Sequence, residues 1–345
     1  MPNHQSVLIV IPTLNEAPHI AGVLANLLDE TLPDADLMFV VADGGSDDGT
    51  QEIVTKIAEG RENLRLVHNP QRLQSAAINL AVQEYGAGRD LLIRCDAHAT
   101  YPHGFVGKLV SSFGRRSADA IVVPMDSYGI GCFQRAVAWV SDSKVGSGGS
   151  SHRGGTASGY VDHGHHALFR MESFCRVGGY DPSFGHNEDA ELDCRQRALG
   201  SRIFLDANIR LGYLPRATPT KLARQYFNYG WGRSRTVRRH PGSLKARQLA
   251  IPLLVLGTAA TVLIAPIVPA LLILPTLYLA IIAANGAAIG LRRRSLCGLL
   301  AAPAAAIMHF AWGTGFLLGW LRLCEEPWRI SHPIEARPPQ TFGPR

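Results

Sequence analysis

A carboxylate and an imidazole stand two residues apart after a short apolar run. In LLIRCDAHATYP, residues 91–102, the apolar residues of a buried strand are followed by Asp96 and then His98. On an extended chain, residues two apart project to the same side. The same residue types before a proline also make an ordinary turn at the end of a strand. The alternative with chemical content is a divalent metal site, which needs further groups from elsewhere in the chain.

The elements that would position this pair alternate between strands and helices. SVLIVIPTLNE, DLMFVVADGGSDDGT and DLLIRCDAH each contain an apolar run that ends in polar residues, and stretches with helical spacing lie between them. Such alternation predicts a mostly parallel α/β sheet with right-handed crossovers, whose ligands bind beyond the carboxyl ends of the strands. Polar residues of three strands are then expected to converge at one edge: Thr13, Asn15, Glu16, Asp43, Asp96 and His98.

The chain beyond residue 101 is less regular. DAIVVPMDSYG and SRIFLDANIRLGYLP indicate strands, and residues 143–170 are predicted to form a Gly/Ser-rich loop. HNEDAELDCRQRALG predicts a helix with Asn187 as N-cap, acidic residues in the first turn and Gly200 at the C-terminus. The histidines of HGHHALF, residues 163–169, have a weak metal-binding pattern without carboxylates. We assign this segment, including His165, to the acceptor-binding loop.

Charge and cysteine content restrict the partners and the compartment. The chain of 345 residues has a formal net charge of +6, and residues 221–247 contain basic residues but no Asp or Glu. Such a segment suits nucleic acid or anionic lipid. Because an apolar run follows at once, we interpret residues 221–248 as an interfacial helix on lipid rather than a nucleic-acid site. The six cysteines show no C-x-x-C pair and are predicted to be reduced thiols in a cytoplasmic setting.

Two long uncharged runs predict a membrane region. No charged residue occurs from Leu249 to Leu291 or from Ser295 to Leu321, and Arg292–Arg294 lie between these runs. The lengths predict about three spans near 249–267, 270–290 and 297–321, with a hairpin at APIVP. Basic residues before the first span and at 292–294 place the N-terminal part in the cytoplasm. A third segment that crosses fully puts the tail outside, whereas a re-entrant one returns it to the inside.

The ordered motifs resemble those of family 2 inverting glycosyltransferases, which have the GT-A fold. The matched stretches are IPTLNE (11–16), DGGSDDGT (43–50), DAH (96–98), RMESFCRVGGYDPSF (170–184) and NEDAELDCR (187–195), and they cover about residues 5–215. DAHATYP, QYFNYGWGRSRTVRRHP and the C-terminal spans are similar to the ExoA-like branch, membrane enzymes that extend lipid-linked sugars in succinoglycan-type exopolysaccharide synthesis.

The resemblance implies roles for individual residues. Asp96 would bind the metal and the sugar diphosphate, together with His98, and the metal would be Mn²⁺ or Mg²⁺. Asp189 would be the general base that deprotonates the acceptor hydroxyl. Asp43 would hold the uracil ring in a pocket lined by Pro12, Thr13 and Glu16. Residues placed near the acceptor or a gate on the same basis are Glu188, His165, Arg195, Gln225, Gly230 and Arg233.

Two positions depart from the family pattern. The last Asp of the Asp-x-Asp motif is His98 in this chain, and the Q-x-x-R-W motif of processive synthases is replaced by Gln225-Tyr226-Phe227-Asn228-Tyr229. The missing Arg and Trp argue against processive polymerisation.

The resulting prediction is an α/β, Rossmann-like GT-A catalytic domain (1–220), a basic interfacial segment (221–248), a transmembrane region (249–321) and a polar tail (322–345). The expected activity is transfer from a UDP-sugar, with UDP-glucose suggested by the branch, to a lipid-linked acceptor of the undecaprenyl-diphosphate type. The protein is expected to be a multi-pass protein of the cell (inner) membrane, with membrane lipids and other glycan-assembly enzymes as partners and no nucleic acid. The alternatives are a polyprenyl-phosphate sugar synthase and a non-catalytic membrane subunit of a glycan-assembly complex.

Overall fold

The computed structural model describes residues 5–30, 32–149, 154–322, 324–326 and 328, and the chain divides into two compact units. The first unit includes Met1–Pro124 and Thr156–Leu211. The second comprises Met125–Gly155 and Gly212–Trp328.

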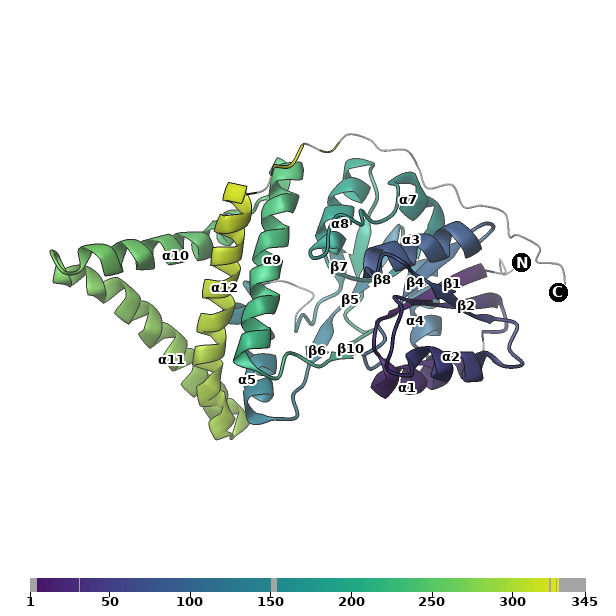
Figure 1. The fold of residues 1–345 in the computed structure, drawn as a ribbon, viewed down its shortest axis with the longest axis horizontal. Helices are drawn as coiled ribbons and strands as arrows, with labels where there is room; N and C mark the ends of the chain where they lie inside the picture. The colour runs from purple at the N-terminus through teal and green to yellow at the C-terminus, as the bar shows by residue number, and fades with distance from the viewer. Residues whose placement is uncertain (1–4, 31, 150–153, 323, 327, 329–345) are drawn as a thin grey trace. The chain divides into compact units, whose positions relative to one another are not determined.

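The first unit is built on one sheet (Figure 1). Its strands are β1 (Gln5–Thr13), β2 (Ala35–Asp43), β3 (Leu64–His68), β4 (Leu91–Arg94), β5 (Ala120–Val123), β7 (Gly159–Val161), β8 (His165–Arg170) and β9 (Ile203–Leu205). They lie in the order β3-β2-β1-β4-β8-β5-β9-β7. The helices of this unit are α1 (Ala17–Leu28), α2 (Thr50–Ala58), α3 (Gln74–Tyr85), α4 (Phe105–Gly114), α7 (Met171–Arg176) and α8 (Glu188–Ala198).

The predicted parallel sheet is confirmed in its N-terminal half. β1 pairs in parallel with both β2 and β4, and β2 pairs in parallel with β3. The central residues of β1, the last five residues of β2 and all of β4 are buried, as expected for strands covered on both faces. In this register Thr13 lies beside Asp43, so the carboxyl ends of the two strands meet at one edge of the sheet.

The predicted loop at 143–170 is wrong in its second half. Gly159–Val161 and His165–Arg170 are strands, and β8 lies antiparallel between β4 and β5 in the middle of the sheet. β8 has only three consecutive apolar residues, preceded by glycine and histidines, so its composition hid the strand. Its pairing with β5 also changes register between Ile121 and Val122.

The second unit is mostly helical. Its helices are α5 (Cys132–Ser141), α6 (Lys144–Ser147), α9 (Pro219–Arg239), α10 (Ala246–Ile264), α11 (Ile273–Arg293) and α12 (Ala301–Arg322). Short 3-10 turns connect them: η1 (Pro241–Ser243), η2 (Pro269–Leu272) and η3 (Leu296–Leu300). The strands β6 (Met125–Ser127) and β10 (Leu211–Tyr213) form a separate two-stranded sheet.

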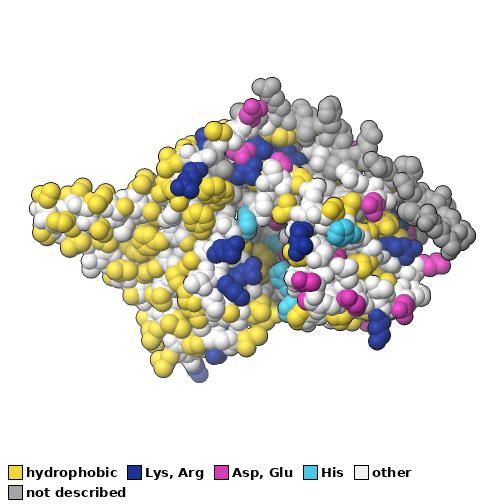
Figure 2. Space-filling model, viewed as in Figure 1, with side chains coloured by type: hydrophobic (Ala, Val, Ile, Leu, Met, Phe, Trp, Pro, Cys, Tyr) yellow, Lys and Arg dark blue, Asp and Glu magenta, His cyan; other side chains and the backbone are white. Residues whose placement is uncertain are grey.

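The three predicted apolar segments are confirmed as helices. Ala246–Ile264, Pro269–Arg293 and Leu296–Arg322 are each long and apolar enough to cross a membrane. The turn between the first two falls at Ala265–Ile267, within APIVP. Hydrophobic side chains cover the projecting α10–α11 part of this unit (Figure 2).

The prediction that all six cysteines are reduced is wrong for two of them. Cys132, at the start of α5, and Cys297, in η3, form a disulfide with a Cα–Cα distance of 5.1 Å. The two are 165 residues apart, so no local spacing pattern could reveal the pair. Cys95, Cys175, Cys194 and Cys324 take no part in this disulfide.

Candidate active site

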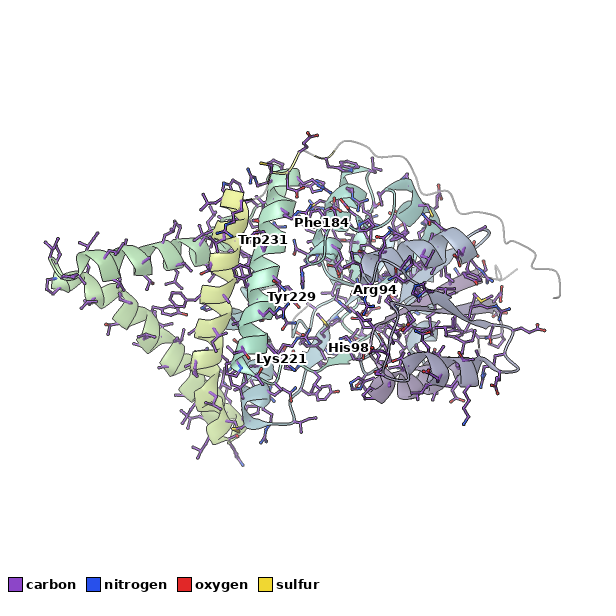
Figure 3. The ribbon with its side chains drawn as sticks, in the orientation of Figure 1. Arg94, His98, Phe184, Lys221, Tyr229 and Trp231 are labelled. Atoms are coloured by element: carbon purple, nitrogen blue, oxygen red, sulfur yellow. A yellow bond between two sulfur atoms is a disulfide. The ribbon has the colours of Figure 1, made fainter. Side chains whose placement is uncertain are left out.

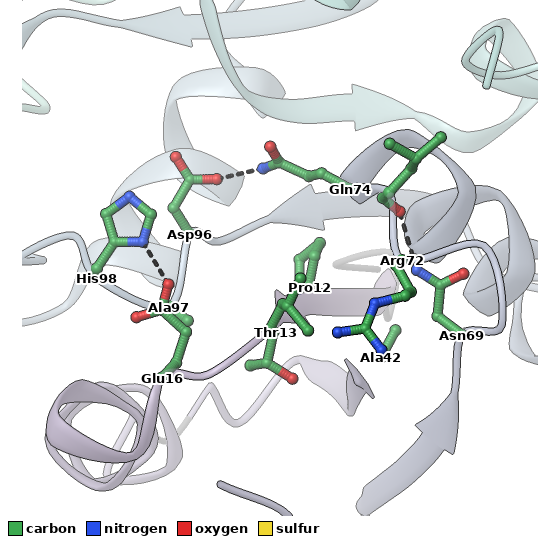
Figure 4. A pocket seen from close by; sticks show the side chains of 12 residues that line it. Pro12, Thr13, Glu16, Ala42, Asn69, Arg72, Gln74, Asp96, Ala97 and His98 are labelled. Atoms are coloured by element: carbon green, nitrogen blue, oxygen red, sulfur yellow. Dashed lines mark hydrogen bonds and ion pairs between the residues drawn. The ribbon is translucent and has the colours of Figure 1, made fainter. Parts of the chain in front are cut away.

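A pocket opens at the carboxyl edge of the sheet in the first unit. Its lining residues come from the ends of β1, β2 and β4 and from the loop before α3: Pro12, Thr13, Leu14, Glu16, Ala42, Asn69, Arg72, Leu73, Gln74, Asp96, Ala97 and His98. Five residues predicted for the nucleotide-sugar or metal site are therefore brought together (Figure 4). Asp43 is absent from this lining.

His98 is held by a carboxylate from another strand end. Its Nδ1 lies 2.8 Å from Oε1 of Glu16, which follows β1. The His98 side chain is about half exposed, whereas that of Glu16 is mostly buried. Such a carboxylate–imidazole contact fixes the tautomer and the orientation of the ring.

Asp96 is surrounded by nitrogen-bearing groups. Gln74 Nε2 donates to Asp96 Oδ1 at 2.6 Å, and His165 Nε2 lies 3.7 Å from Asp96 Oδ2. Burial raises the pKa of Asp96, but the charge of Arg94 and the imidazoles of His165 and His98 lower it by more than burial raises it. The pKa of Asp96 therefore lies below its usual range. The carboxyl group is therefore ionised at neutral pH.

Arg94, the last residue of β4, connects Asp96, predicted to bind the metal and the diphosphate, with Asp189, the predicted general base. Its Nη1 donates to Asp189 Oδ1 at 2.6 Å, and its Nε lies 3.4 Å from Asp96 Oδ1. The Arg94 side chain is only 5% exposed. Figure 3 labels Arg94 among the side chains of the first unit. Asp96 and Asp189, which are 93 positions apart in the sequence, are thus held by one guanidinium group.

Tyr180 completes this arrangement. Its hydroxyl donates to Asp189 Oδ1 at 2.7 Å and accepts from Arg94 Nη1 at 3.1 Å. Asn79 of α3 holds the Tyr180 backbone through hydrogen bonds to both its amide and its carbonyl. The Asp189 carboxylate therefore receives two strong donors on one oxygen.

The two acids at the start of α8 have opposite pKa shifts. Burial would raise the pKa of Asp189, but the Arg94 charge, the nearby imidazoles of His166 and His165 and the Tyr180 hydrogen bond hold it well below its usual range. Burial and the neighbouring Asp189 charge raise the pKa of Glu188 to about 7. Pairs of acids whose pKa values are driven apart are typical of general acid–base sites.

Asp43 makes its hydrogen bonds to the turn that follows β2. Its carboxylate accepts from Thr13 Oγ1 at 3.0 Å, from the amides of Gly45 and Ser46 at 2.9 and 2.8 Å, and from Ser46 Oγ at 2.5 Å. The side chain is buried. A uracil ring would therefore have to share or replace one of these donors.

The three histidines at 163–166 face two different carboxylates. His163 Nδ1 lies 2.6 Å from Asp193 Oδ2, and His166 Nε2 contacts the other oxygen of Asp193. His165 faces Asp96 instead. The described part of the chain contains no group of three His, Cys, Asp or Glu side chains that could hold a metal ion by themselves.

Arg195 is buried within α8. It forms an ion pair of 2.7 Å with Glu191 one turn earlier, and its Nη1 donates to the Val177 carbonyl at 2.5 Å. Both side chains are almost fully buried. These contacts give Arg195 a structural position that ties α8 to the turn after α7.

Three further predicted residues lie on α9 in the second unit. Gln225 Nε2 donates to the hydroxyls of Tyr213 and Tyr229 at 3.0 Å. A Cβ at Gly230 would overlap the Trp312 carbonyl oxygen, so this glycine permits close packing of α9 on α12. Arg233 is buried, and its guanidinium contacts the Ser243 carbonyl and Gln248.

Sequence reasoning missed Arg94, Tyr180 and Gln74. Tyr180 stands within a quoted motif and Arg94 two residues before Asp96, so both were in view without a role. An arginine in an otherwise apolar buried strand was the available signal, because a buried cation needs a partner.

The residues present fit a divalent ion only in part. Asp96 offers an ionised carboxylate, and imidazoles of His98 and His165 lie on the same edge. Oxygen and imidazole ligands suit Mn²⁺ and related ions. Glu16, the other carboxylate of the pocket, contacts His98. Because the described side chains contain no complete ligand group, the remaining ligands would have to come from substrate phosphates.

Comparisons with known proteins define the class. Residues 8–178 match the model of glycosyl transferase family 2. The succinoglycan biosynthesis protein ExoA of Rhizobium meliloti (strain 1021) is 43% identical over 94% of this chain and 97% of its own length. A dolichyl N-acetyl-α-D-glucosaminyl phosphate 3-β-D-2,3-diacetamido-2,3-dideoxy-β-D-glucuronosyltransferase of Methanococcus voltae is 22% identical over 67% of the chain and 74% of its own length.

The fold is also found among solved structures. The mannosyltransferase PcManGT from Pyrobaculum calidifontis, in complex with GDP-Man and Mn²⁺, has a TM-score of 0.56 at 22% identity and covers 89% of this chain and 88% of its own. The sheet and the ordered motifs therefore define a glycosyltransferase with the GT-A fold. The chain belongs to glycosyltransferase family 2.

Proposed function

We propose that this protein is a membrane-bound inverting glycosyltransferase of exopolysaccharide or cell-surface glycan synthesis. It moves a sugar from a UDP-sugar, with UDP-glucose as the first choice, to a lipid-linked saccharide acceptor on the cytoplasmic face of the cell membrane. The observation that supports this proposal is that Arg94 contacts both Asp96, which lines the pocket, and Asp189. The proposal assigns these carboxylates to the diphosphate and to the acceptor hydroxyl. The similarity to a succinoglycan biosynthesis protein over nearly the whole chain supports the pathway.

In this proposal the pocket takes the nucleotide. Pro12, Thr13, Glu16, Asp96 and His98 all line this pocket. We assign the first three to the base and ribose, and Asp96 and His98 to the diphosphate. Bound there, a divalent ion would neutralise the charge that develops on the departing diphosphate. Asp189, ionised at neutral pH, accepts the proton of the attacking hydroxyl, and Arg94 and Tyr180 fix the orientation of its carboxylate.

Product identification tests the proposal. Membranes containing the full chain are supplied with radiolabelled UDP-glucose, other UDP-sugars or GDP-mannose, and the lipid and saccharide products are separated. The proposal expects label from a UDP-sugar on a lipid-linked saccharide. Label on the polyprenyl phosphate itself would favour the sugar-phosphate synthase instead, and transfer from GDP-mannose alone would overturn the choice of nucleotide.

The imidazole of His98, at the position of the last Asp of the family motif, leads to a prediction about which metal ion supports activity. Imidazole binds later first-row ions better than Mg²⁺, which prefers oxygen ligands. If His98 is a ligand, activity will be higher with Mn²⁺ than with Mg²⁺, and His98→Asp will shift the preference towards Mg²⁺. The measurement is the ratio of transfer rates with the two ions. An unchanged ratio in the variant would assign His98 to phosphate or acceptor contacts.

Membrane attachment gives a further prediction. The protein is expected to remain in the membrane fraction through washes with high salt and with carbonate, because uncharged helices rather than surface charge hold it there. Fractionation followed by immunodetection measures this. Release by salt alone would mean a peripheral, electrostatic attachment.

A further inference from the structure

We propose that α10 and α11 enter the bilayer as a hairpin, whereas α12 stays at the membrane surface, packed along α9 on the same side as the catalytic unit. The inference concerns the second unit and rests on the proposed membrane attachment, but not on the activity. All three helices have the length and composition of spans. They differ in how much of each is covered by the rest of the protein. In the apolar 18-residue stretch of each segment, the buried share is 11% for the segments of α10 and of α11, and 44% for that of α12.

α9 is too strongly charged to lie in hydrocarbon. Between Pro219 and Arg239 it has no acidic residue and six basic ones: Lys221, Arg224, Arg233, Arg235, Arg238 and Arg239. A basic side chain at the centre of a membrane helix strongly opposes insertion of that helix into the bilayer. Several such residues on one helix therefore keep α9 outside the bilayer core.

α12 cannot separate from α9 without losing backbone contacts. A Cβ at Gly230 would overlap the Trp312 carbonyl, and one at Gly315 would overlap the Phe227 carbonyl. A Cβ at Gly319 would meet the Ser234 hydroxyl. These three contacts hold α9 and α12 against each other along their length. If α9 lies outside the bilayer core, α12 must therefore lie outside it too. Figure 1 shows α9 and α12 side by side.

Ion pairs hold the C-terminal end of α12 to the basic end of α9. Glu325, just past α12, contacts Arg235 and lies 3.0 Å from Arg239 Nη2. Arg238 Nη1 donates to the Trp320 carbonyl at 2.7 Å. If α12 crossed the bilayer, its C-terminal end would reach the opposite membrane face. The arginines at the end of α9 that contact it, and the start of α10 that follows them, would then have to lie at that opposite face as well.

α12 also bridges the two ends of the hairpin. In its C-terminal half, Gly313 faces Ile251 and Val255 of α10, and before its first turn Gly298 faces Gly290 of α11. The basic residues that flank the hairpin, Lys245 and Arg247 on one side and Arg292–Arg294 on the other, are thus joined by α12. An α12 that lies in the membrane plane keeps both groups at one face, as cationic anchors to anionic headgroups require.

The hairpin itself has the surface of a membrane-inserted element. Its outer part is exposed and apolar, with Leu263, Ile267 and Ile273 each at least 70% exposed. No charged residue interrupts Leu249–Leu291. A patch of this extent on a protein in water is unfavourable, and a bilayer is the partner whose chemistry it fits.

Cysteine labelling in whole membranes tests the arrangement. Cys324 is a free, exposed thiol just after α12, so it reports the side on which α12 ends. A membrane-impermeant maleimide is applied to intact spheroplasts and to inside-out vesicles containing the full chain. The Cys324→Ser variant gives the background from the other thiols. Glu59→Cys in that variant reports the side of the catalytic unit, because residue 59 is exposed at the end of α2.

The proposal expects Cys324 and the Glu59→Cys site to react in the same preparation and to be protected in the other. Reaction of the two sites in opposite preparations would overturn it, because α12 would then cross. Labelling of Cys324 only after detergent would also overturn it, because the thiol would lie within the bilayer. If both sites react from outside, α12 is placed as proposed and only the cytoplasmic orientation in the proposed function is wrong.

Discussion

Replacement of Asp189 by asparagine is expected to lower sugar transfer roughly a hundredfold or more, the usual contribution of a positioned general base. The amide keeps the shape of the carboxylate and still accepts from Arg94 and Tyr180, but it no longer takes a proton. Transfer is measured with saturating UDP-sugar and defined acceptor.

Measurements of UDP binding distinguish the general-base role of Asp189 from the binding roles assigned to Asp96 and Asp43. UDP affinity measured by calorimetry with metal present should change by less than roughly half a kcal/mol in Asp189→Asn, as for a residue without ground-state contact to the donor. Asp96→Asn is expected to lose metal-dependent UDP binding together with transfer. Asp43→Ala should weaken UDP binding with or without metal. It should also loosen the turn after β2, because the amides of Gly45 and Ser46 donate hydrogen bonds to the Asp43 carboxylate.

Glu188 is the competing base, and the pH dependence distinguishes the two. A base works in its ionised form, so activity falls as the pH drops through its pKa. With its pKa raised to about 7, Glu188 would place the acid limb near neutrality, whereas Asp189 would leave activity unaffected until much lower pH. Near-normal transfer in Asp189→Asn combined with a large loss in Glu188→Gln would reassign the base.

The sequence predicted the part of the site that local patterns encode. Asp96, His98, Thr13 and Glu16 follow apolar runs, and parallel strands bring such ends to one edge, so their convergence follows from topology alone. The apolar helices were equally visible, because length and lack of charge suffice to recognise them.

Long-range pairing was not predictable in this way. Nothing in the spacing shows that Arg94 reaches Asp189, that Asp193 contacts both His163 and His166, or that Cys132 meets Cys297. Each pair depends on the antiparallel insertion of β8 or on helix packing, which one sequence does not encode as a periodicity. Arg195 shows the other side of this limit: the motif gave no sign that this charged residue lies in a buried ion pair with Glu191, so its site role stays a prediction.

Arg94→Met is expected to have the second large effect, on stability and on pH dependence together. Removing the guanidinium leaves Asp189 and Asp96 buried beside each other without their shared cation. Breaking a buried pair in this way costs about 3–5 kcal/mol of unfolding free energy, so the thermal unfolding temperature in detergent should fall clearly. Burial then raises the pKa of Asp189 against only the weaker lowering effects of His166, His165 and Tyr180, so the acid limb of the activity profile moves to higher pH.

Two variants show whether this effect belongs to the Arg94 contact. Arg94→Lys keeps the charge without the planar fork, so it should recover part of the stability and return the acid limb towards its original position. Arg170→Met removes another arginine–aspartate pair of the same unit, with Asp119 at 3.3 Å, but this Arg170 side chain is 44% exposed. A surface pair contributes at most about 1 kcal/mol, so stability and pH profile should hardly change there. If Arg94→Met behaved like Arg170→Met, the guanidinium would not set the ionisation of Asp189, and the low pKa of that carboxylate would need another source.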